Sequence, residues 1–404
     1  MNQNDRVIDK VLNKEIRIGR ISFKVIDLIF VVCIWLLALW VRLELYPIVS
    51  ADYWGFLEEW MNKIKELGGF RSMGTKISNY SSSYMYLMCL VSGFENSMYA
   101  LKTISVVFDY AASVAVFLIV YELTNSTRKS VIGMTILLLC PTVFIDSAYW
   151  CQCDIIYTCI ILYSLYFLFR GNSKISLIIL GIAFSFKLQT AFILPFFIIM
   201  WLKKKTVKLF DFFYIPIVYN IIQLPAWMLG RPFGELVGVY FDQSSYYPWG
   251  TLEYPNIYAL LDETIESSHH MYEITGAGMI LTICILGFVA YYIYVKNLRM
   301  TQDLMITIAL FTVAVTVYFL PHMHDRYGFL IDLLAIVYAV LRPRKAPIML
   351  GFFIVSVLTF MPYLIAVHIL PLSIVALIQL VLIAFVGYDM YKQIDNNFKI
   401  SGTC

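Results

Sequence analysis

Residues 25–46 read VIDLIFVVCIWLLALWVRLELY, an apolar run whose charged residues lie near its two ends. An α-helix of this length and polarity fits the roughly 30 Å hydrocarbon layer of a bilayer. Similar runs recur along the chain, which has 404 residues, 60% of them hydrophobic and only 14% charged. A soluble domain carries about a quarter charged residues, and backbone groups within lipid must bond inside their own segment. The sequence therefore predicts an all-α polytopic membrane protein.

We expect about 12 transmembrane helices, one at each apolar run. They fall near residues 25–46, 98–122, 130–148, 154–169, 175–188, 190–202, 209–229, 271–295, 303–320, 327–341, 346–368 and 371–391. The pair at 175–202 could also be one long helix, which would place Lys187 and Gln189 inside the membrane. Two short helices that meet at the outer surface would instead place both residues in an aqueous site. No small-residue cleavage site follows the first run, so we predict a retained helix and not a signal peptide.

The distribution of basic residues orients the chain. When both termini are cytoplasmic, the inner segments hold most of the 30 Lys and Arg residues, as the positive-inside rule requires. We therefore expect a cytoplasmic N-terminal segment (1–24), a transmembrane module (25–342), and C-terminal supporting helices with a cytoplasmic tail (343–404). The module includes two long outer loops, 47–97 and 230–270.

The first outer loop contains a candidate interfacial helix. Its apolar residues recur at helical spacing with charged residues between them; they are Leu57, Trp60, Met61, Ile64 and Leu67. This pattern suits a helix that lies in the membrane interface. A helix that packs on the rest of the protein is an equal alternative.

The composition argues against two classes of partner or site. The formal net charge is only +3, and no basic and aromatic strip indicates nucleic-acid binding. The eight cysteines are scattered and mostly lie in apolar runs, where Cys behaves as a small hydrophobe. Their spacing indicates neither a disulfide framework nor a zinc site.

Five polar clusters lie at helix ends that this topology places on the outer side. They are Ser50-Ala51-Asp52-Tyr53-Trp54, Asn79-Tyr80-Ser81-Ser82-Ser83-Tyr84, Tyr149-Trp150-Cys151-Gln152-Cys153-Asp154, Lys187-Leu188-Gln189 and His322-Met323-His324-Asp325-Arg326-Tyr327. Ionisable residues in such positions are functional candidates by default. Five clusters on one side predict a functional site at the outer surface.

Each charged residue of these clusters has a chemical and a structural interpretation. Asp52 could act as a general base on a hydroxyl, or it could cap the helix that follows. Lys187 and Arg326 could bind phosphate oxygens, or they could anchor helices at the interface. The two histidines of the last cluster and its aspartate form an incomplete metal-ligand set. We therefore favour His324 as a hydrogen-bond donor to phosphate or sugar.

Other polar and aromatic residues are candidates for sugar contact. Gln152 and Asp154 stand at the start of a helix, where they could hold sugar hydroxyls, orient the phosphate ligands or cap the helix. In the second outer loop, Trp249, Tyr254 and Asn256 suit contact with a sugar face. They suit an aromatic belt at the membrane interface slightly better.

In their order and spacing, these clusters resemble the polytopic type C glycosyltransferases, in particular bacterial relatives of the second mannosyltransferase of GPI-anchor synthesis. The matching elements are Asp52, Trp60, Asn79-Tyr80-Ser81-Ser82, Trp150-Cys151-Gln152-Cys153-Asp154, Lys187-Leu188-Gln189 and His324-Asp325-Arg326-Tyr327. Five residues depart from the family pattern: Ser81 and Ser82 replace two prolines, Cys151 a glycine, Leu188 a proline and Asp325 a glutamate. The ionisable residues of the pattern otherwise remain.

The resemblance implies the type C glycosyltransferase fold and transfer of a hexose, with inversion, from a polyprenyl-phosphate sugar to an acceptor hydroxyl on the extracytoplasmic face. The acceptor would be a cell-envelope polysaccharide or a glycolipid. Asp52 would be the catalytic base, and Lys187, His324 and Arg326 would bind the donor phosphate. The implied substrate-binding residues are Tyr80, Trp150, Gln152, Asp154, Gln189 and Tyr327. No cofactor is required, and a divalent metal stays an open alternative. A polytopic transporter or a lipid-linked-oligosaccharide flippase is the competing interpretation.

Overall fold

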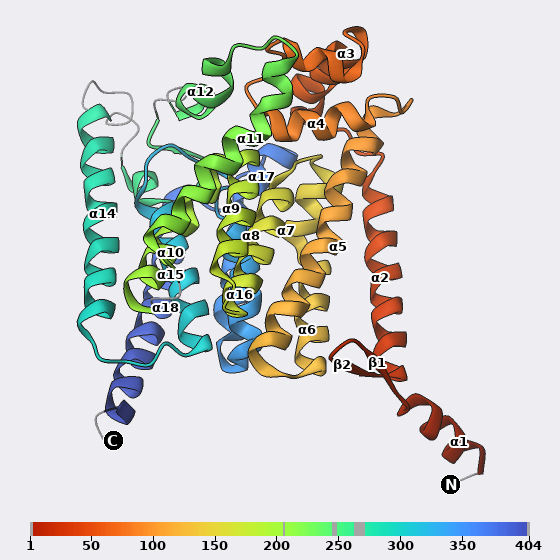
Figure 1. Cartoon of the computed structure of the whole chain (residues 1–404), viewed down its shortest axis with the longest axis vertical. Coiled ribbons are helices and arrows are strands. Elements are labelled where there is room, and N and C mark those ends of the chain that lie inside the picture. The colour runs from red at the N-terminus through yellow and green to blue at the C-terminus, as the bar shows by residue number, and fades with distance from the viewer. Residues whose placement is uncertain (1–2, 205–206, 245–248, 262–270, 402–404) are drawn as a thin grey trace.

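A computed structural model describes residues 3–204, 207–244, 249–261 and 271–401. It is a bundle of upright helices in which both chain ends lie at one end of the bundle (Figure 1). The opposite end is covered by the short helices α3 (Glu58–Glu66), α4 (Ser82–Val91) and α12 (Phe233–Ser244). We call these three helices, with the turn η1 (Tyr53–Leu57) that precedes α3, the cap.

The predicted apolar ranges all contain helices. The bundle helices are α2 (Val25–Leu45), α5 (Ser97–Thr124), α6 (Thr127–Leu138), α7 (Pro141–Phe144), α8 (Asp154–Phe169), α9 (Ser173–Phe186), α10 (Leu194–Lys204), α11 (Tyr214–Met228), α14 (Met271–Val295), α15 (Gln302–Phe319), α16 (Phe329–Leu341), α17 (Ala346–Ile365) and α18 (Leu372–Ser401). An N-terminal helix α1 (Gln3–Leu12) precedes the antiparallel strands β1 (Glu15–Ile18) and β2 (Ile21–Lys24). A second, parallel pair joins β3 (Thr251–Leu252) to β4 (Met323–His324). The remaining turns are η2 (Gly69–Gly74), η3 (Ile145–Tyr149), η4 (Leu188–Ile193), η5 (Leu209–Phe213), η6 (Ile257–Leu260) and η7 (Pro343–Lys345).

The lengths and surfaces of the helices confirm the membrane class. Seven helices in the described part of the chain are long and apolar enough to span a bilayer. The pair Thr127–Leu138 and Pro141–Tyr149, bent by 47°, adds an eighth if it forms one span. α2 and α14 stand at opposite edges of the bundle (Figure 1), and only 11% and 17% of their apolar windows are buried inside the protein. Water does not favour such large apolar faces, so the chain is an all-α polytopic membrane protein.

The chain breaks at Lys187, and one long helix over 175–202 is excluded. α9 ends at Phe186, Lys187 has an extended backbone with φ −149° and ψ 138°, and η4 follows as a 3-10 turn before α10 begins. A Lys side chain in lipid is costly, and the break turns this one toward a polar cavity described below. The predicted pair of short helices is therefore confirmed.

Most of the apolar face of α3 is covered by protein. Met61 and Ile64 are fully buried, and Leu57 is nearly so. α3 packs against η2, α4 and α5, as expected for the alternative of a helix that packs on the rest of the protein. The period of 3.6 residues identifies an apolar face but not its partner. Leu67, which follows α3, and Trp54 and Phe56 in η1 stay exposed.

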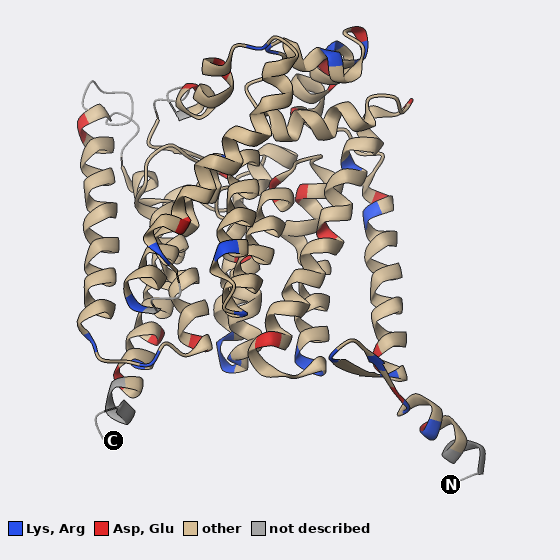
Figure 2. Ribbon diagram, viewed as in Figure 1, with Lys and Arg blue, Asp and Glu red and all other residues tan. Residues whose placement is uncertain are grey.

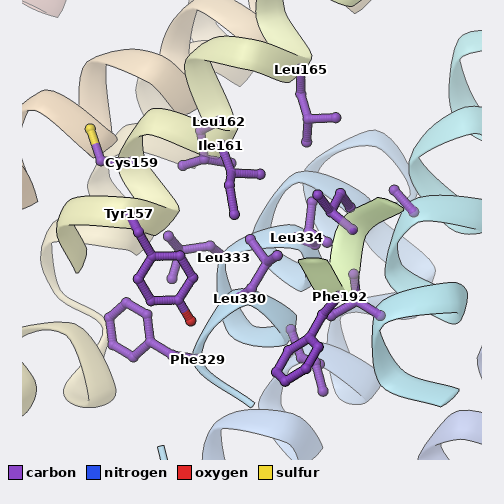
Figure 3. Packing of buried hydrophobic residues seen from close by; sticks show 14 of the residues in the cluster. Tyr157, Cys159, Ile161, Leu162, Leu165, Phe192, Phe329, Leu330, Leu333 and Leu334 are labelled. Carbon is purple, nitrogen blue, oxygen red and sulfur yellow. The ribbon is translucent and has the colours of Figure 1, made fainter. Parts of the chain in front are cut away.

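The interior of the bundle is packed with branched and aromatic side chains. Leu330, Leu333 and Leu334 lie on one face of α16, where positions three and four residues apart are neighbours. Figure 3 shows them between α8, represented by Ile161, and η4, represented by Phe192. This core fixes the N-terminal parts of α8 and α16, and two of the five polar clusters lie at the starts of these helices.

Buried polar contacts hold the segment that leads from α2 to the cap. Lys102 on α5 donates to the carbonyl oxygens of Leu45, Tyr46 and Ile48 at 3.2, 3.0 and 2.6 Å. These carbonyls end α2, where a helix leaves backbone acceptors unpaired. The loop that carries the first polar cluster thus leaves the bundle in a fixed direction.

The C-terminal helices pack on the bundle. α17 contacts α16, and α18 contacts α15 and α17. The Asp389 carboxylate on α18 accepts a hydrogen bond from the Tyr338 hydroxyl on α16 at 2.8 Å and pairs with Arg342 at 3.2 Å. The segment 343–404, predicted as support only, also places one side chain of α17 in the cavity described next.

Candidate active site

A cavity of about 360 Å³ lies where the cap meets the helix ends of the bundle. All five predicted polar clusters contribute to its wall. The predicted site residues that line it are Asp52, Tyr80, Gln152, Lys187, Gln189, His324, Arg326 and Tyr327. The remaining two, Trp150 and Asp154, lie directly behind this wall and contact residues of it. Ten positions that span 276 residues of sequence thus belong to one site.

Asp52 is held by side chains from two distant clusters. Its Oδ2 accepts a hydrogen bond from Gln152 Nε2 at 2.5 Å and another from Arg326 Nη1 at 3.1 Å. The carboxylate makes no capping hydrogen bond to the turn that follows it, so the helix-cap alternative is excluded. Ser50 fixes the backbone beneath Asp52, because its hydroxyl donates to the Trp150 carbonyl oxygen at 2.6 Å and accepts from a backbone amide.

Lys187 and Asp154 form a buried ion pair. Lys187 Nζ lies 2.6 Å from Asp154 Oδ1, and the two side chains are 11% and 0% exposed. The Nζ atom also lies 5.9 Å and 5.8 Å from the ring centres of Tyr80 and Tyr157. Burial alone would lower the pKa of Lys187, but the Asp154 carboxylate raises it well above its usual value. Lys187 is therefore a charged residue of the site and not an interface anchor.

Arg326 connects the two carboxylates. Besides its bond to Asp52, its Nε lies 3.3 Å from Asp154 Oδ2. The guanidinium carbon lies 4.5 Å from the centre of the Trp150 ring, in the geometry of a cation–π contact. Since the side chain is only 14% exposed, it is fixed between these partners. The interface-anchor alternative is excluded for Arg326 as well.

The pKa values of His324 and Asp325 are shifted from their ordinary values in opposite directions. Burial, helped by the positive charges of Arg326 and Lys187, lowers the pKa of His324 to about 3. His324 is thus a neutral imidazole near pH 7, able to donate one hydrogen bond without adding charge. Burial raises the pKa of Asp325 to about 7, with Asp52 and Asp154 adding to the rise.

Irregular backbone places two of the clusters. The π-helical turns η1 and η3 occur immediately after Asp52 and immediately before Trp150, and such turns are frequent at functional sites. Cys151 has φ +64°, a left-handed conformation that favours glycine. This conformation turns the chain between Trp150 and Gln152, so that the first faces Arg326 and the second faces Asp52.

Several cavity residues were not predicted from the sequence. Asp325 was considered only as part of an incomplete metal-ligand set and as the substitute for a glutamate of the family pattern, without a role of its own. Gln243 on α12 and Tyr363 on α17 line the cavity from segments that carry no recognisable motif. Gln243 Nε2 donates to the Asn79 carbonyl oxygen at 2.5 Å and thereby ties the cap to the second cluster. These residues come to the cavity only because the fold brings together segments that are distant in the sequence.

The candidates from the second outer loop have structural surroundings. Asn256 is fully buried and donates to the Gly250 carbonyl oxygen at 3.1 Å, and Tyr254 is buried against Gln379. Neither lines the cavity, so sugar contact by these two residues is not supported, and neither is exposed as a belt residue would be. Trp249 is exposed, as a belt residue would be. Within the described residues, no group of three or more His, Cys, Asp or Glu side chains could hold a metal ion.

A scan against protein-family models and a search of curated proteins found no match to this chain. An interpretation of the site therefore depends on its own residues and geometry, together with the ordered motifs of the sequence.

Proposed function

We propose that this protein is a glycosyltransferase that moves a hexose from a polyprenyl-phosphate sugar to a hydroxyl of a cell-envelope polysaccharide or glycolipid. The observation that carries the proposal is the contact of Asp52 with Gln152 and Arg326 in a cavity that Lys187 also lines. A carboxylate base in one cavity with two cations suits an inverting transfer from a phosphate leaving group.

In the proposed reaction, Asp52 takes the proton of the acceptor hydroxyl as the hydroxyl oxygen attacks the anomeric carbon. The bond from that carbon to the phosphate oxygen breaks, and the configuration at the carbon inverts. Lys187 and Arg326 stabilise the charge that develops on the departing polyprenyl phosphate. His324 acts there as a neutral donor, because its pKa of about 3 leaves it uncharged.

The backbone at Cys151 supports the family resemblance independently of the side chains. The family pattern has a glycine at this position, and Cys151 has the left-handed φ of +64° that glycine adopts most readily. The departure from the pattern thus occurs at a position whose conformation explains why the pattern has glycine. This is the behaviour expected of a diverged member of the type C glycosyltransferase family.

We further propose that the seven long helices, the bent pair of α6 and α7, and the shorter helices α8, α9, α10 and α16 form a bundle of about 12 spans with the type C glycosyltransferase fold. Both termini would be cytoplasmic, and the site would face the extracytoplasmic side. Figure 2 supports this orientation, since many Lys and Arg residues lie at the bundle end that holds both termini. The cavity, by contrast, opens beneath the cap at the other end.

The proposal is tested by transfer of radiolabelled sugar from synthetic polyprenyl-phosphate hexoses by the purified protein in lipid. Release of sugar to water is scored together with transfer to crude membrane lipids, because the acceptor is unidentified. Asp52→Asn should lower turnover by a factor of roughly 10²–10⁴, the usual contribution of a general base.

The matched control is Glu59→Gln, which removes an exposed carboxylate of α3 that pairs with Lys63 outside the cavity. This variant should keep wild-type turnover. Equal activity of Asp52→Asn and wild type would remove Asp52 as the base. No turnover of any donor, with substrate-dependent flux in sealed vesicles, would favour a transporter or flippase instead.

A further inference from the structure

Asp325 is anchored through its backbone and belongs to the cavity wall. Its amide donates to the Leu252 carbonyl oxygen on β3 at 2.9 Å, and its carbonyl oxygen accepts from the Thr359 hydroxyl on α17 at 3.3 Å. Two separate elements therefore fix the residue. The side chain is only 2% exposed, yet it belongs to the cavity wall.

One oxygen of this carboxyl group has no hydrogen-bond partner among the described residues. Asp325 Oδ2 is buried and unpaired. The neighbouring cation, Arg326, uses Nη1 for Asp52 and directs Nε toward Asp154. The His324 Nδ1 atom lies 3.8 Å from Asp325 Oδ1, too far for a hydrogen bond. Buried polar atoms are nearly always paired. We therefore expect the partner of this oxygen to be a molecule that binds in the cavity.

An aromatic wall lies beside it. Tyr363 lines the same cavity, and its ring lies 5.9 Å from that of Trp150, which also packs edge-on against Phe360 at 5.2 Å. The Tyr363 ring is thus held by a buried aromatic stack, while 42% of the residue stays exposed. A rigid aromatic face next to an unpaired carboxyl oxygen matches a sugar ring, which has an apolar C–H face and hydroxyl donors at its edge.

We propose that Asp325 and Tyr363 form a subsite for a pyranose ring, in which a ring hydroxyl donates to Asp325 Oδ2 and the ring packs on Tyr363. The inference rests on the proposed glycosyl transfer and deepens it, because it assigns a recognition role to two residues to which the sequence had given none. The ring could belong to the donor or to the acceptor, since both carry the same chemistry.

Asp325→Asn should weaken sugar binding without lowering the thermal stability of the protein. A structural Asp would leave the protein less stable when it is changed. A buried acid with one unpaired oxygen, whose pKa is raised to about 7, instead opposes folding at pH 8, because the folded state must ionise it in a buried place. The Asn variant without ligand should therefore unfold at an equal or higher temperature than wild type at pH 8.

The same variant should raise the KM of one substrate about tenfold, with little change in kcat, because a charge-assisted hydrogen bond becomes a neutral one. The substrate whose KM rises identifies the ring, donor or acceptor, that occupies the subsite. Tyr363→Ala should affect the same KM, and Tyr363→Phe should restore it. Asp332→Asn is the matched control: Asp332 is a fully buried acid on α16 that does not line the cavity, so this change should leave both KM values unchanged.

Binding of methyl hexopyranosides (mannoside, glucoside and galactoside), measured by saturation-transfer NMR in nanodiscs, separates this proposal from the proposed function. Binding that weakens in Asp325→Asn but not in Asp332→Asn supports the subsite even if wild type transfers no sugar. Unchanged KM values with a lowered unfolding temperature would overturn the subsite and make Asp325 structural. Failure of all three pyranosides to bind wild type would overturn it as well.

Discussion

Asp154→Asn should destabilise the protein more than any other single change at the site. The carboxylate is fully buried and serves two cations, Lys187 at 2.6 Å and Arg326 at 3.3 Å. Removing one partner of a buried ion pair costs about 3–5 kcal/mol, since the other charge stays buried without compensation. Arg326 keeps its bond to Asp52, whereas Lys187 loses the one carboxylate with which it pairs among the described residues. We therefore expect a loss of about 4 kcal/mol, which comes mainly from Lys187.

Equilibrium unfolding in mixed detergent–lipid micelles measures this loss. The double variant Asp154→Asn/Lys187→Met should be more stable than Asp154→Asn alone, because the second change removes the uncompensated charge. A double-mutant cycle should give a coupling energy of about 2 kcal/mol or more, within the range found for residues in one ion-pair network.

The pair Arg42–Asp109 provides the control. Its atoms lie 2.7 Å apart and both side chains are fully buried, but neither residue lines the cavity. Asp109→Asn should cause a loss of similar size, of about 3–5 kcal/mol. If Asp154→Asn costs less than about 1 kcal/mol, or if the double variant is as unstable as the sum of the two single ones, the assignment of a buried pair is refuted.

Two further changes test the electrostatics and the backbone of the site. The pKa of His324 is lowered to about 3 from its ordinary 6.5, so between these pH values the unfolded state binds a proton that the folded state does not. The stability that this group contributes therefore rises with pH across that window. The difference in unfolding temperature between His324→Phe and wild type, measured from pH 3.5 to 7, should show this rise. A difference that stays constant with pH would contradict it. Cys151→Gly should fold and keep its turnover, since a φ of +64° suits glycine. Cys151→Val should give a lower yield of folded protein in detergent, because a β-branched residue strongly disfavours this conformation. Equal yields of the two variants would argue against the left-handed turn.

The helices could be predicted from the sequence because lipid imposes one rule on every spanning segment. An apolar run of sufficient length must be a helix, and each predicted run contains one. The break at Lys187 could also be predicted, since an ammonium group within lipid is unfavourable. The burial of the apolar face of α3 against other parts of the protein could not be predicted. Met61 and Ile64 have the same spacing whether lipid or protein lies against them.

The site residues that could be predicted are those with charged side chains. Asp52, Lys187 and Arg326 could be identified because charged groups are rare in such a chain. Their pairing could not be inferred, because the sequence contains the charges and not the distances between them. Tyr363 shows a second limit: tyrosines are abundant in this chain, and only the packing of α17 on the bundle brings this one to the cavity.

The charges of the site bear on how a phosphate donor would bind to it. Asp52 and Asp154 neutralise Arg326 and Lys187, so a donor phosphate adds negative charge to a site that is already balanced. If the proposed donor is correct, the phosphate must draw a cation away from a carboxylate. Arg326 is the residue to move, because Asp52 is 28% exposed whereas Asp154 is fully buried against both cations. We infer that arrival of the donor would release one oxygen of Asp52 for the acceptor hydroxyl, an oxygen that Gln152 and Arg326 otherwise hold.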